Sequence, residues 1–226
     1  MAVITGLYSN GCSFNSPNNK SFVKEYPGLL VSKYFDLNHH HYAQGGRGNY
    51  RIDVTTKIFY ETYSQFKQNT LALIEWTSPF RRDYPTNDNF LPHPQQTTTW
   101  RTWQTLEQIK WLKTLPGHDL DQDHSLFMLN TILNLQSYFK HNNIKYIMYF
   151  GLPNEIIVNQ QDHKTLYDAI DWNHFFNPHS NQLDFVNENG LRISVADRHP
   201  NSQGHIQWSN QLIEFCKQIY PGLSKN

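Results

Sequence analysis

Short apolar runs that suit buried strands alternate, along this chain of 226 residues, with longer stretches of helical periodicity. The clearest run is Thr70–Thr77, which polar segments bound on both sides, and Lys145–Phe150 is a second run of this kind. Apolar residues recur at helical spacing over 52–66, 126–139 and 202–220. This alternation predicts an α/β fold in which helices cover both faces of a parallel sheet.

The opening of the chain is less regular. We expect a first strand over residues 2–8 and a second extended segment over 35–43. Between them, the spacing predicts a helix over 20–35 that Pro27 and Gly28 interrupt or kink.

Two long segments, at about 78–118 and 154–195, show no sustained period. Segments of this length without secondary structure are usually functional or mobile when they occur in a compact domain. We therefore expect a single domain over residues 1–226 with insertions at these two places.

Charge and hydropathy narrow the range of functions. Lys and Arg together equal Asp and Glu, at 19 each, so the chain has no basic surplus with which to bind nucleic acid. No apolar stretch approaches the length of a membrane span and no leader pattern opens the sequence, so we expect a cytoplasmic protein that does not bind membranes. Cys12 and Cys216 lie near opposite ends, and we expect both to be free thiols.

A polar turn, Asn10–Phe14 (Asn-Gly-Cys-Ser-Phe), directly follows the first predicted strand. Ligands on parallel sheets gather at the carboxyl ends of the strands, so we expect this turn to lie near Gly45–Asn49, Thr77–Ser78 and Gly151. Ser13 is therefore placed where a nucleophile would stand. The alternative is that its hydroxyl only caps a following helix.

A second polar segment, Asp197–Asn201 (Asp-Arg-His-Pro-Asn), precedes the last predicted helix. A serine hydroxyl attacks at neutral pH only when a histidine takes its proton and a carboxylate orients that histidine. His199 and Asp197 offer these groups, although a His-Pro pair can also simply begin a helix. The two segments together predict an active site.

The chain resembles the SGNH or GDSL-type hydrolases. The resemblance depends on Gly11–Phe14 after the first strand, the glycines after the second, and Asp197–Asn201 before the last helix, and this order covers nearly the whole chain. It implies a three-layer α/β/α sandwich with a central parallel sheet of flavodoxin-like type. It also implies cleavage of ester or acyl groups without a cofactor, with Ser13 as nucleophile, His199 as general base and Asp197 as the orienting acid.

Two features depart from that family's pattern. One residue, Arg198, separates acid and histidine where the family usually has two, and no Gly-x-Asn-Asp follows the third strand, where Glu75–Ser78 stands instead. The missing asparagine normally helps to form the oxyanion hole, so other donors must replace it. The candidates are the backbone amides of Ser13 and Gly46, the side chain of Asn49 and the hydroxyls of Thr77 and Ser78.

Two further groups of residues have chemistry to offer. Arg81 and Arg82 follow the third strand and could bind an anionic substrate, or they could belong to a solvated loop. His39, His40 and His41 suggest a metal site, but neighbouring residues on a strand point to opposite faces and cannot all converge. We therefore expect no bound metal.

These observations favour a serine esterase or deacylase that acts on a small polar ester, for example an acylated carbohydrate. One alternative is a non-catalytic protein that binds a ligand on the same scaffold. The other is an enzyme that uses Arg81 or Arg82 to act on a phosphate or sulfate ester. The sequence does not indicate an oligomeric state.

Overall fold

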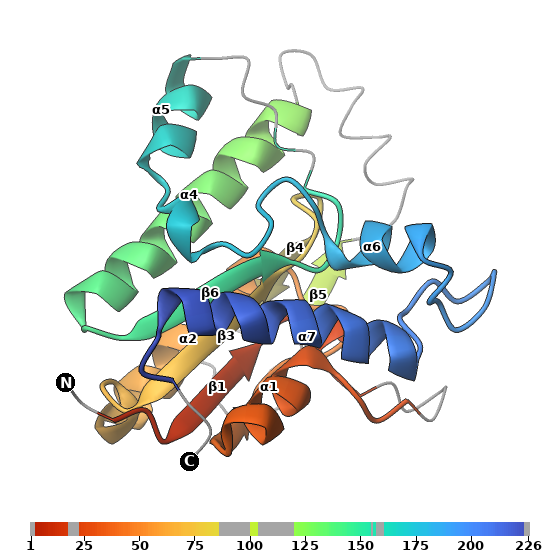
Figure 1. Cartoon of the computed structure of the whole chain (residues 1–226). Coiled ribbons are helices and arrows are strands. Elements are labelled where there is room, and N and C mark those ends of the chain that lie inside the picture. The colour runs from red at the N-terminus through yellow and green to blue at the C-terminus, as the bar shows by residue number, and fades with distance from the viewer. Residues whose placement is uncertain are drawn as a thin grey trace.

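A computed structural model of the chain describes residues 3–17, 23–85, 100–103, 120–154, 156 and 161–223. Its centre is a parallel sheet of four strands in the order β2-β1-β3-β6 (Figure 1). The strands are β1 (Gly6–Asn10), β2 (Asn38–His41), β3 (Thr70–Trp76) and β6 (Lys145–Phe150). The predicted parallel α/β sheet is thus confirmed.

Strand β1 differs from the segment predicted for it. It begins at Gly6 and continues to Asn10, whereas we expected residues 2–8. Pairing explains the shift, because Gly6 lies opposite Asn38 of β2 and opposite Thr70 of β3. Neighbours on both sides bury all five residues of β1, its polar last residue included.

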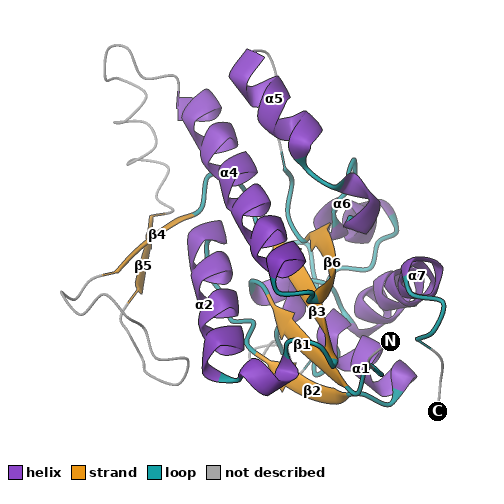
Figure 2. Ribbon diagram, turned by 90° about the vertical axis from the view of Figure 1, so that its left-hand side faces the viewer, coloured by secondary structure: helices purple, strands orange, loops and turns teal. Residues whose placement is uncertain are grey.

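Helices cover both faces of the sheet, as Figure 2 shows. One face carries α2 (Asn49–Thr62) and α4 (Leu120–His141), and the other carries α1 (Pro27–Phe35) and α7 (Ser202–Ile219). Alternation along β3 divides the core accordingly, since Ile74 packs in the first cluster and Leu73 in the second. This arrangement is the expected three-layer sandwich.

The helix predicted over residues 20–35 was wrong at its start. Helix α1 begins at Pro27 and is not kinked by it, because proline occupies the first turn, where its missing N–H is not needed. The helix ends at Phe35, and its C-cap residue, Asp36, adopts a left-handed conformation with φ 53°. Residues 20–22 of the predicted helix lie outside the described residues.

Both predicted insertions contain more regular structure than we expected. The first holds an antiparallel hairpin of β4 (Arg82–Pro85) and β5 (Trp100–Trp103), where we expected at most short helices. The second holds α5 (Gln161–Ala169), the 3-10 helix η3 (Trp172–His174) and α6 (Gln182–Glu188). A further 3-10 helix, η2 (Ser64–Phe66), follows α2.

The outer edge of β6 is closed by contacts that need no fifth strand. Tyr220 Oη accepts the amide of Tyr146 and donates to its carbonyl, both at 3.0 Å, and the Phe176 amide donates to Met148 O at 2.8 Å. These bonds satisfy groups that would otherwise offer an open edge to another chain. None of the helices in the described ranges is long and apolar enough to cross a membrane.

Candidate active site

The turn after β1 carries the predicted nucleophile. Ser13 is the first residue of the 3-10 helix η1 (Ser13–Asn15), whose N-cap residue is Cys12. The Ser13 hydroxyl does not cap a helix, because its Oγ lies 2.9 Å from His199 Nε2. Cys12 and Phe14 are buried while Ser13 is partly exposed. The side chains on both sides of Ser13 therefore anchor the turn in the core and leave the Ser13 hydroxyl accessible.

The segment before α7 folds back on itself and carries the acid and the base. The Ile193 amide donates to His199 O at 2.9 Å, and the Asn201 amide donates to Leu191 O at 2.8 Å. Asn201 also begins α7, since its side chain accepts the amide of Gly204 at 2.8 Å. These bonds fix the loop that carries Asp197 and His199 to residues 191–193 on one side and to α7 on the other.

Asp197 reaches His199 although only one residue separates them. Its Oδ1 accepts the backbone amide of His199 at 3.0 Å and lies 2.6 Å from the ring Nδ1. A carboxylate that accepts the amide two residues further on forms an Asx-turn. This local turn explains how the unusual spacing still joins acid and imidazole.

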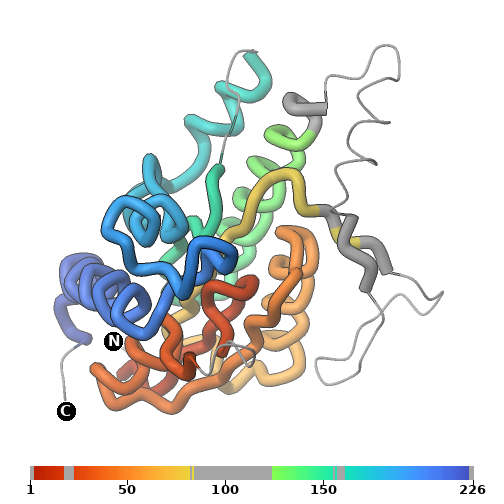
Figure 3. The backbone as a smooth tube through the Cα atoms, turned by 90° about the vertical axis from the view of Figure 1, so that its right-hand side faces the viewer, coloured from red at the N-terminus to blue at the C-terminus, as the bar shows by residue number. Residues whose placement is uncertain are grey.

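Ser13, His199 and Asp197 therefore form one hydrogen-bonded path. It joins the turn after β1 to the segment before α7, which are red and blue and lie side by side in Figure 3. With a proton on Nδ1 for Asp197, Nε2 is able to accept the proton of the Ser13 hydroxyl. The side chains of His199 and Asp197 are 35% and 37% exposed, so the path is open to solvent. The Phe14 ring packs 5.2 Å from the imidazole, centroid to centroid.

The glycine-rich segment after β2 lies against the nucleophile turn, as expected for loops at one sheet edge. The Gln44 amide donates to Gly11 O at 3.2 Å, and a Cβ on Gly45 would stand 3.6 Å from Ser13 Cβ. Gly46 has φ +80°, a conformation that glycine adopts without steric cost. The role of the Gly46 amide as an oxyanion donor stays a prediction.

A buried polar cluster that the sequence did not reveal fixes how these two turns meet. Arg47 Nη1 and the Gly11 amide both donate to Asn10 Oδ1, each at 2.9 Å. Asn10 Nδ2 donates to the hydroxyls of Thr55 and Thr56 in α2, also at 2.9 Å. Asn10 is thus the junction between β1, the glycine-rich segment and α2.

Asn49, at the start of α2, joins that helix to the turn after β3. Its Nδ2 donates to Thr77 O at 3.2 Å and to Ser78 O at 3.3 Å, and its Oδ1 accepts the Thr77 amide at 2.9 Å. Both hydrogens of the amide are therefore engaged in this structure. Thr77 Oγ1 is buried and makes no hydrogen bond within the described part of the chain, while Ser78 Oγ accepts the Phe80 amide at 3.4 Å.

The two arginines after β3 have different positions. Burial raises the pKa of Cys12 and of Glu75, and the nearby charge of Arg81 opposes both shifts, so its guanidinium lies close to the nucleophile turn. Arg81 Nη1 is buried, and no described residue is its hydrogen-bond partner. Arg82 is the first residue of β4.

The three histidines of β2 point in alternating directions. His39 Nε2 and His41 Nδ1 lie 2.7 and 3.4 Å from Ser9 Oγ, whereas the His40 ring packs 4.4 Å from that of Phe66. Burial lowers the pKa of His39 and of His41 to about 4. Within the described ranges, no group of three or more His, Cys, Asp or Glu side chains is arranged to hold a metal ion.

A buried pair directly beneath Ser13 also escaped the sequence analysis. Cys12 Sγ donates to Glu75 Oε1 at 2.7 Å, and both residues are fully buried. Burial raises the pKa of the Glu75 carboxyl to about 7. The available signal was a glutamate inside the apolar run of β3, since glutamate is almost never fully buried without a partner.

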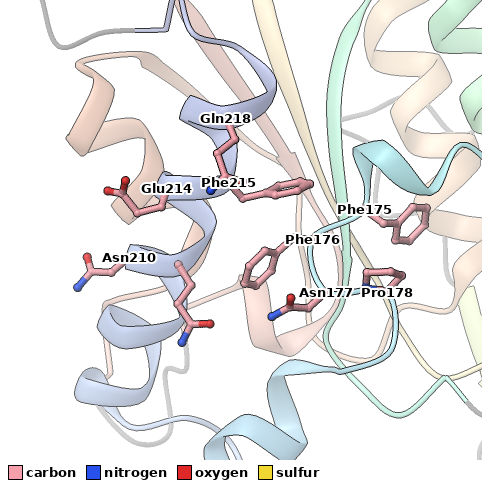
Figure 4. Close-up of a pocket in the computed structure, with 9 residues that line it drawn as sticks. Phe175, Phe176, Asn177, Pro178, Asn210, Glu214, Phe215 and Gln218 are labelled. Atoms are coloured by element: carbon pink, nitrogen blue, oxygen red, sulfur yellow. The ribbon is translucent and has the colours of Figure 1, made fainter.

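A separate pocket of about 640 Å³ lies between α7 and the segment after η3 (Figure 4). The rings of Phe176 and Phe215 lie between the two sides in that view. None of the predicted site residues lines it, so the pocket is distinct from the Ser13 site. Its lining residues are Phe175, Phe176, Asn177, Pro178, Asn210, Gln211, Glu214, Phe215 and Gln218.

Similarity to known proteins is visible in structure and not in sequence. No protein-family model and no curated protein sequence matches the chain. A psychrotrophic esterase from a Pseudoalteromonas species aligns over 96% of this chain and 99% of its own, with a TM-score of 0.55 and 11% identity. An acetyl xylan esterase from the rumen bacterium Butyrivibrio proteoclasticus aligns over 98% of this chain, with a TM-score of 0.50 and 10% identity.

This chain spans 66% of the length of the acetyl xylan esterase. At such low identity the two alignments show a shared fold. They confirm the α/β fold expected from the sequence, which this chain shares with the two esterases.

Proposed function

We propose that the chain is a serine esterase or deacylase, with Ser13 as nucleophile, His199 as general base and Asp197 as the residue that orients the imidazole. The observation that carries this proposal is the path from Ser13 Oγ to His199 Nε2, at 2.9 Å, and from His199 Nδ1 to Asp197 Oδ1, at 2.6 Å. The shared fold with two esterases supports ester cleavage as the reaction.

In the proposed reaction, Ser13 Oγ attacks the carbonyl carbon of the ester as its proton passes to His199 Nε2. The tetrahedral intermediate collapses when the C–O bond breaks and His199 gives that proton to the departing alcohol. Water then attacks the acyl-enzyme, with His199 again as base, and releases the acid and free Ser13. Asp197 stabilises the imidazolium that forms in each half-reaction and stays ionised.

The developing oxyanion needs donors that are already in position. We assign this role to the backbone amides of Ser13 and Gly46, because the glycine-rich segment packs directly on the nucleophile turn. Thr77 Oγ1, buried without a partner among the described residues, is the side-chain candidate. Asn49 instead shapes the turn that carries Thr77.

The substrate that we favour is a small polar ester such as an acetylated carbohydrate. One of the two similar enzymes is an acetyl xylan esterase, which gives a first compound class to test. The partly exposed His199 and Asp197 suit a substrate that approaches from solvent.

A fluorophosphonate probe tests the nucleophile directly, since it reacts with activated serines. The similar Pseudoalteromonas enzyme was solved in a form inhibited by monoethylphosphonate. We expect labelling at Ser13 by peptide mass spectrometry, loss of labelling in Ser13→Ala, and full labelling in Ser9→Ala. Folded wild-type protein that stays unlabelled and hydrolyses no ester would favour the non-catalytic binding protein.

A second candidate function is cleavage of an ester that carries an anionic group, such as a phosphate or sulfate ester. The observation that favours it is Arg81 Nη1, which is buried near the nucleophile turn without a hydrogen-bond partner in the described ranges. We expect Arg81→Gln to lower kcat/KM about tenfold for an anionic ester and to leave a neutral ester of similar size unchanged. Equal losses for both esters would remove this candidate.

A further inference from the structure

Glu75 occupies a position where a charged side chain is costly. It lies near the carboxyl end of β3, in an apolar strand, and its side chain is fully buried. An isolated buried carboxylate is strongly disfavoured, so the partners that compensate for it define its role. These partners come from the turn that carries Ser13.

Two glycines make room for this carboxylate. A Cβ on Gly11 would lie 2.6 Å from Glu75 Cβ, and a Cβ on Gly151 would overlap with Glu75 Oε1. Gly11 follows β1 and Gly151 follows β6, so the ends of the two strands that flank β3 leave room for the Glu75 side chain. Glu75 therefore packs directly beneath the turn.

Glu75 is hydrogen-bonded to the same turn through Oε1, while its Oε2 is buried and has no hydrogen-bond partner in the described ranges. Cys12 Sγ donates to Oε1 at 2.7 Å, and Cys12 is the residue immediately before Ser13. The backbone amides of Cys12 and Asn15 also favour the ionised carboxylate. The residues on both sides of the nucleophile are thus coupled to the charge on Glu75.

We propose that Glu75 is a positioning residue of the hydrolytic site, whose ionised carboxylate holds Cys12 and thereby fixes the direction of Ser13 Oγ toward His199. This inference rests on the proposed function. Glu75 is fully buried, and the hydrogen bonds of the His199 ring in the described ranges go to Asp197 and Ser13, so Glu75 acts through the turn. Its loss is expected to change kcat and to leave KM almost unchanged.

The protonation of Glu75 falls in an experimentally accessible range. Burial raises its pKa to about 7, against the opposing effects of the Cys12 thiol, the Arg81 charge and the two backbone amides. Tyr149, on β6, is a further titratable group close to it, and the nearby Glu75 helps to raise the pKa of that phenol well above its usual value. Cys12 and Tyr149 both stay neutral around pH 7, so Glu75 is the group in this cluster that changes charge there.

The test compares wild-type protein with Glu75→Gln, which keeps the size of the side chain and fixes it in a neutral form. The kcat of wild type is divided by the kcat of Glu75→Gln, and this ratio is measured from pH 5.5 to 8.5 on one neutral ester. We expect the ratio to be near one at pH 5.5 and to rise to about tenfold at pH 8.5, the worth of one charge-assisted hydrogen bond. The two proteins share every other titratable group, so the ratio isolates the effect of the charge on Glu75.

Variants at Cys12 test the same link while the Glu75 side chain is retained. We expect Cys12→Ala to lower kcat at pH 8.5 and Cys12→Ser, which keeps a donor for Glu75, to restore most of it. Glu214→Gln, at an exposed carboxylate of α7, is the control and should give a ratio that does not depend on pH. Thermal unfolding identifies any variant that fails to fold.

The outcomes separate this inference from the function on which it rests. An active wild type with a constant kcat ratio, or a change confined to KM, would overturn the role of Glu75 and leave the esterase intact. Wild-type protein without labelling at Ser13 and without hydrolysis would overturn both.

Discussion

Among the described residues, two serines lie within hydrogen-bond reach of a histidine, and one of these two pairs has the surroundings of an active site. Ser13 Oγ is 2.9 Å from His199 Nε2, and Ser9 Oγ is 2.7 Å from His39 Nε2. The second contact is the shorter one. Distance between serine and histidine therefore does not separate a reactive pair from a structural one.

The difference lies in what surrounds each pair. His199 has Asp197 on its other ring nitrogen, whereas no carboxylate in the described part of the chain bonds to His39. Ser13 is partly exposed, but Ser9 is fully buried. Burial also lowers the pKa of His39 to about 4, so that ring is a weak base. An orienting acid and access for a substrate distinguish the first pair.

The largest expected effect comes from the same substitution at the two histidines. His199→Gln removes the general base, and we expect kcat/KM for a small activated ester to fall by about 10⁴-fold. His39→Gln keeps a hydrogen-bonding group beside Ser9 and should change kcat/KM by less than about threefold, since this pair does no chemistry. Both are measured at pH 8 on folded protein, and similar losses at the two positions would refute the distinction.

That Ser13 and His199 lie close together was predictable from the sequence, because it depends on local residue types and on the topology of a parallel sheet. The turn after β1 and the segment before α7 have recognisable residue types, and parallel strands bring their carboxyl ends to one edge. The bounds of β3 and β6 were also close to those predicted, because buried parallel strands read as short apolar runs.

Other features depend on contacts between distant segments and leave no periodic signal. The hairpin of β4 and β5 and the short helix α6 have too few residues to show a period. The pairing of Cys12 with Glu75, 63 positions apart, depends on the space that Gly11 and Gly151 leave. A single sequence shows an unusual glutamate in a strand but not its partner.

The next largest effect is expected at Asp197, the carboxylate beside His199 that has no counterpart beside His39. Asp197→Asn keeps the shape of the side chain but can no longer stabilise an imidazolium or favour the reactive tautomer. We expect kcat to fall by about 10²- to 10⁴-fold. The backbone amide of His199 can still donate to the asparagine oxygen, so the Asx-turn and the melting temperature should persist.

Steady-state kinetics and thermal unfolding check this prediction together. Ser194→Ala is a matched control in the same loop, because it removes only the bond from the Asp197 amide to Ser194 Oγ. Asp197→Asn with nearly full kcat would show that the carboxylate does not separate the two serine-histidine pairs.

The smallest expected effect is on the free energy of unfolding, and it arises from the buried histidines beside Ser9. The pKa of His39 and of His41 is about 4 in the folded protein and has its ordinary value near 6.5 in the unfolded chain. Between these values the unfolded chain binds more protons, so the free energy of unfolding decreases as the pH falls from 6.5 toward 4. We expect each ring to contribute a loss on the order of 1 kcal/mol between pH 6.5 and 5.

Denaturant unfolding at pH 7.5 and 5.0 measures this loss in wild type, His39→Gln and His41→Gln. Each substitution should reduce the decrease in stability on acidification, because glutamine does not titrate. The remaining dependence combines a loss from His40 and from His205, whose pKa values burial lowers, to about 4 for His205. Glu75 opposes this loss, because burial raises its pKa to about 7 and the folded protein takes up its proton first as the pH falls. His179→Gln, at an exposed position, is the control for replacing a histidine with glutamine. If both strand variants lose as much stability as wild type, these rings do not resist protonation, and weak basicity no longer distinguishes the Ser9 pair from the Ser13 pair.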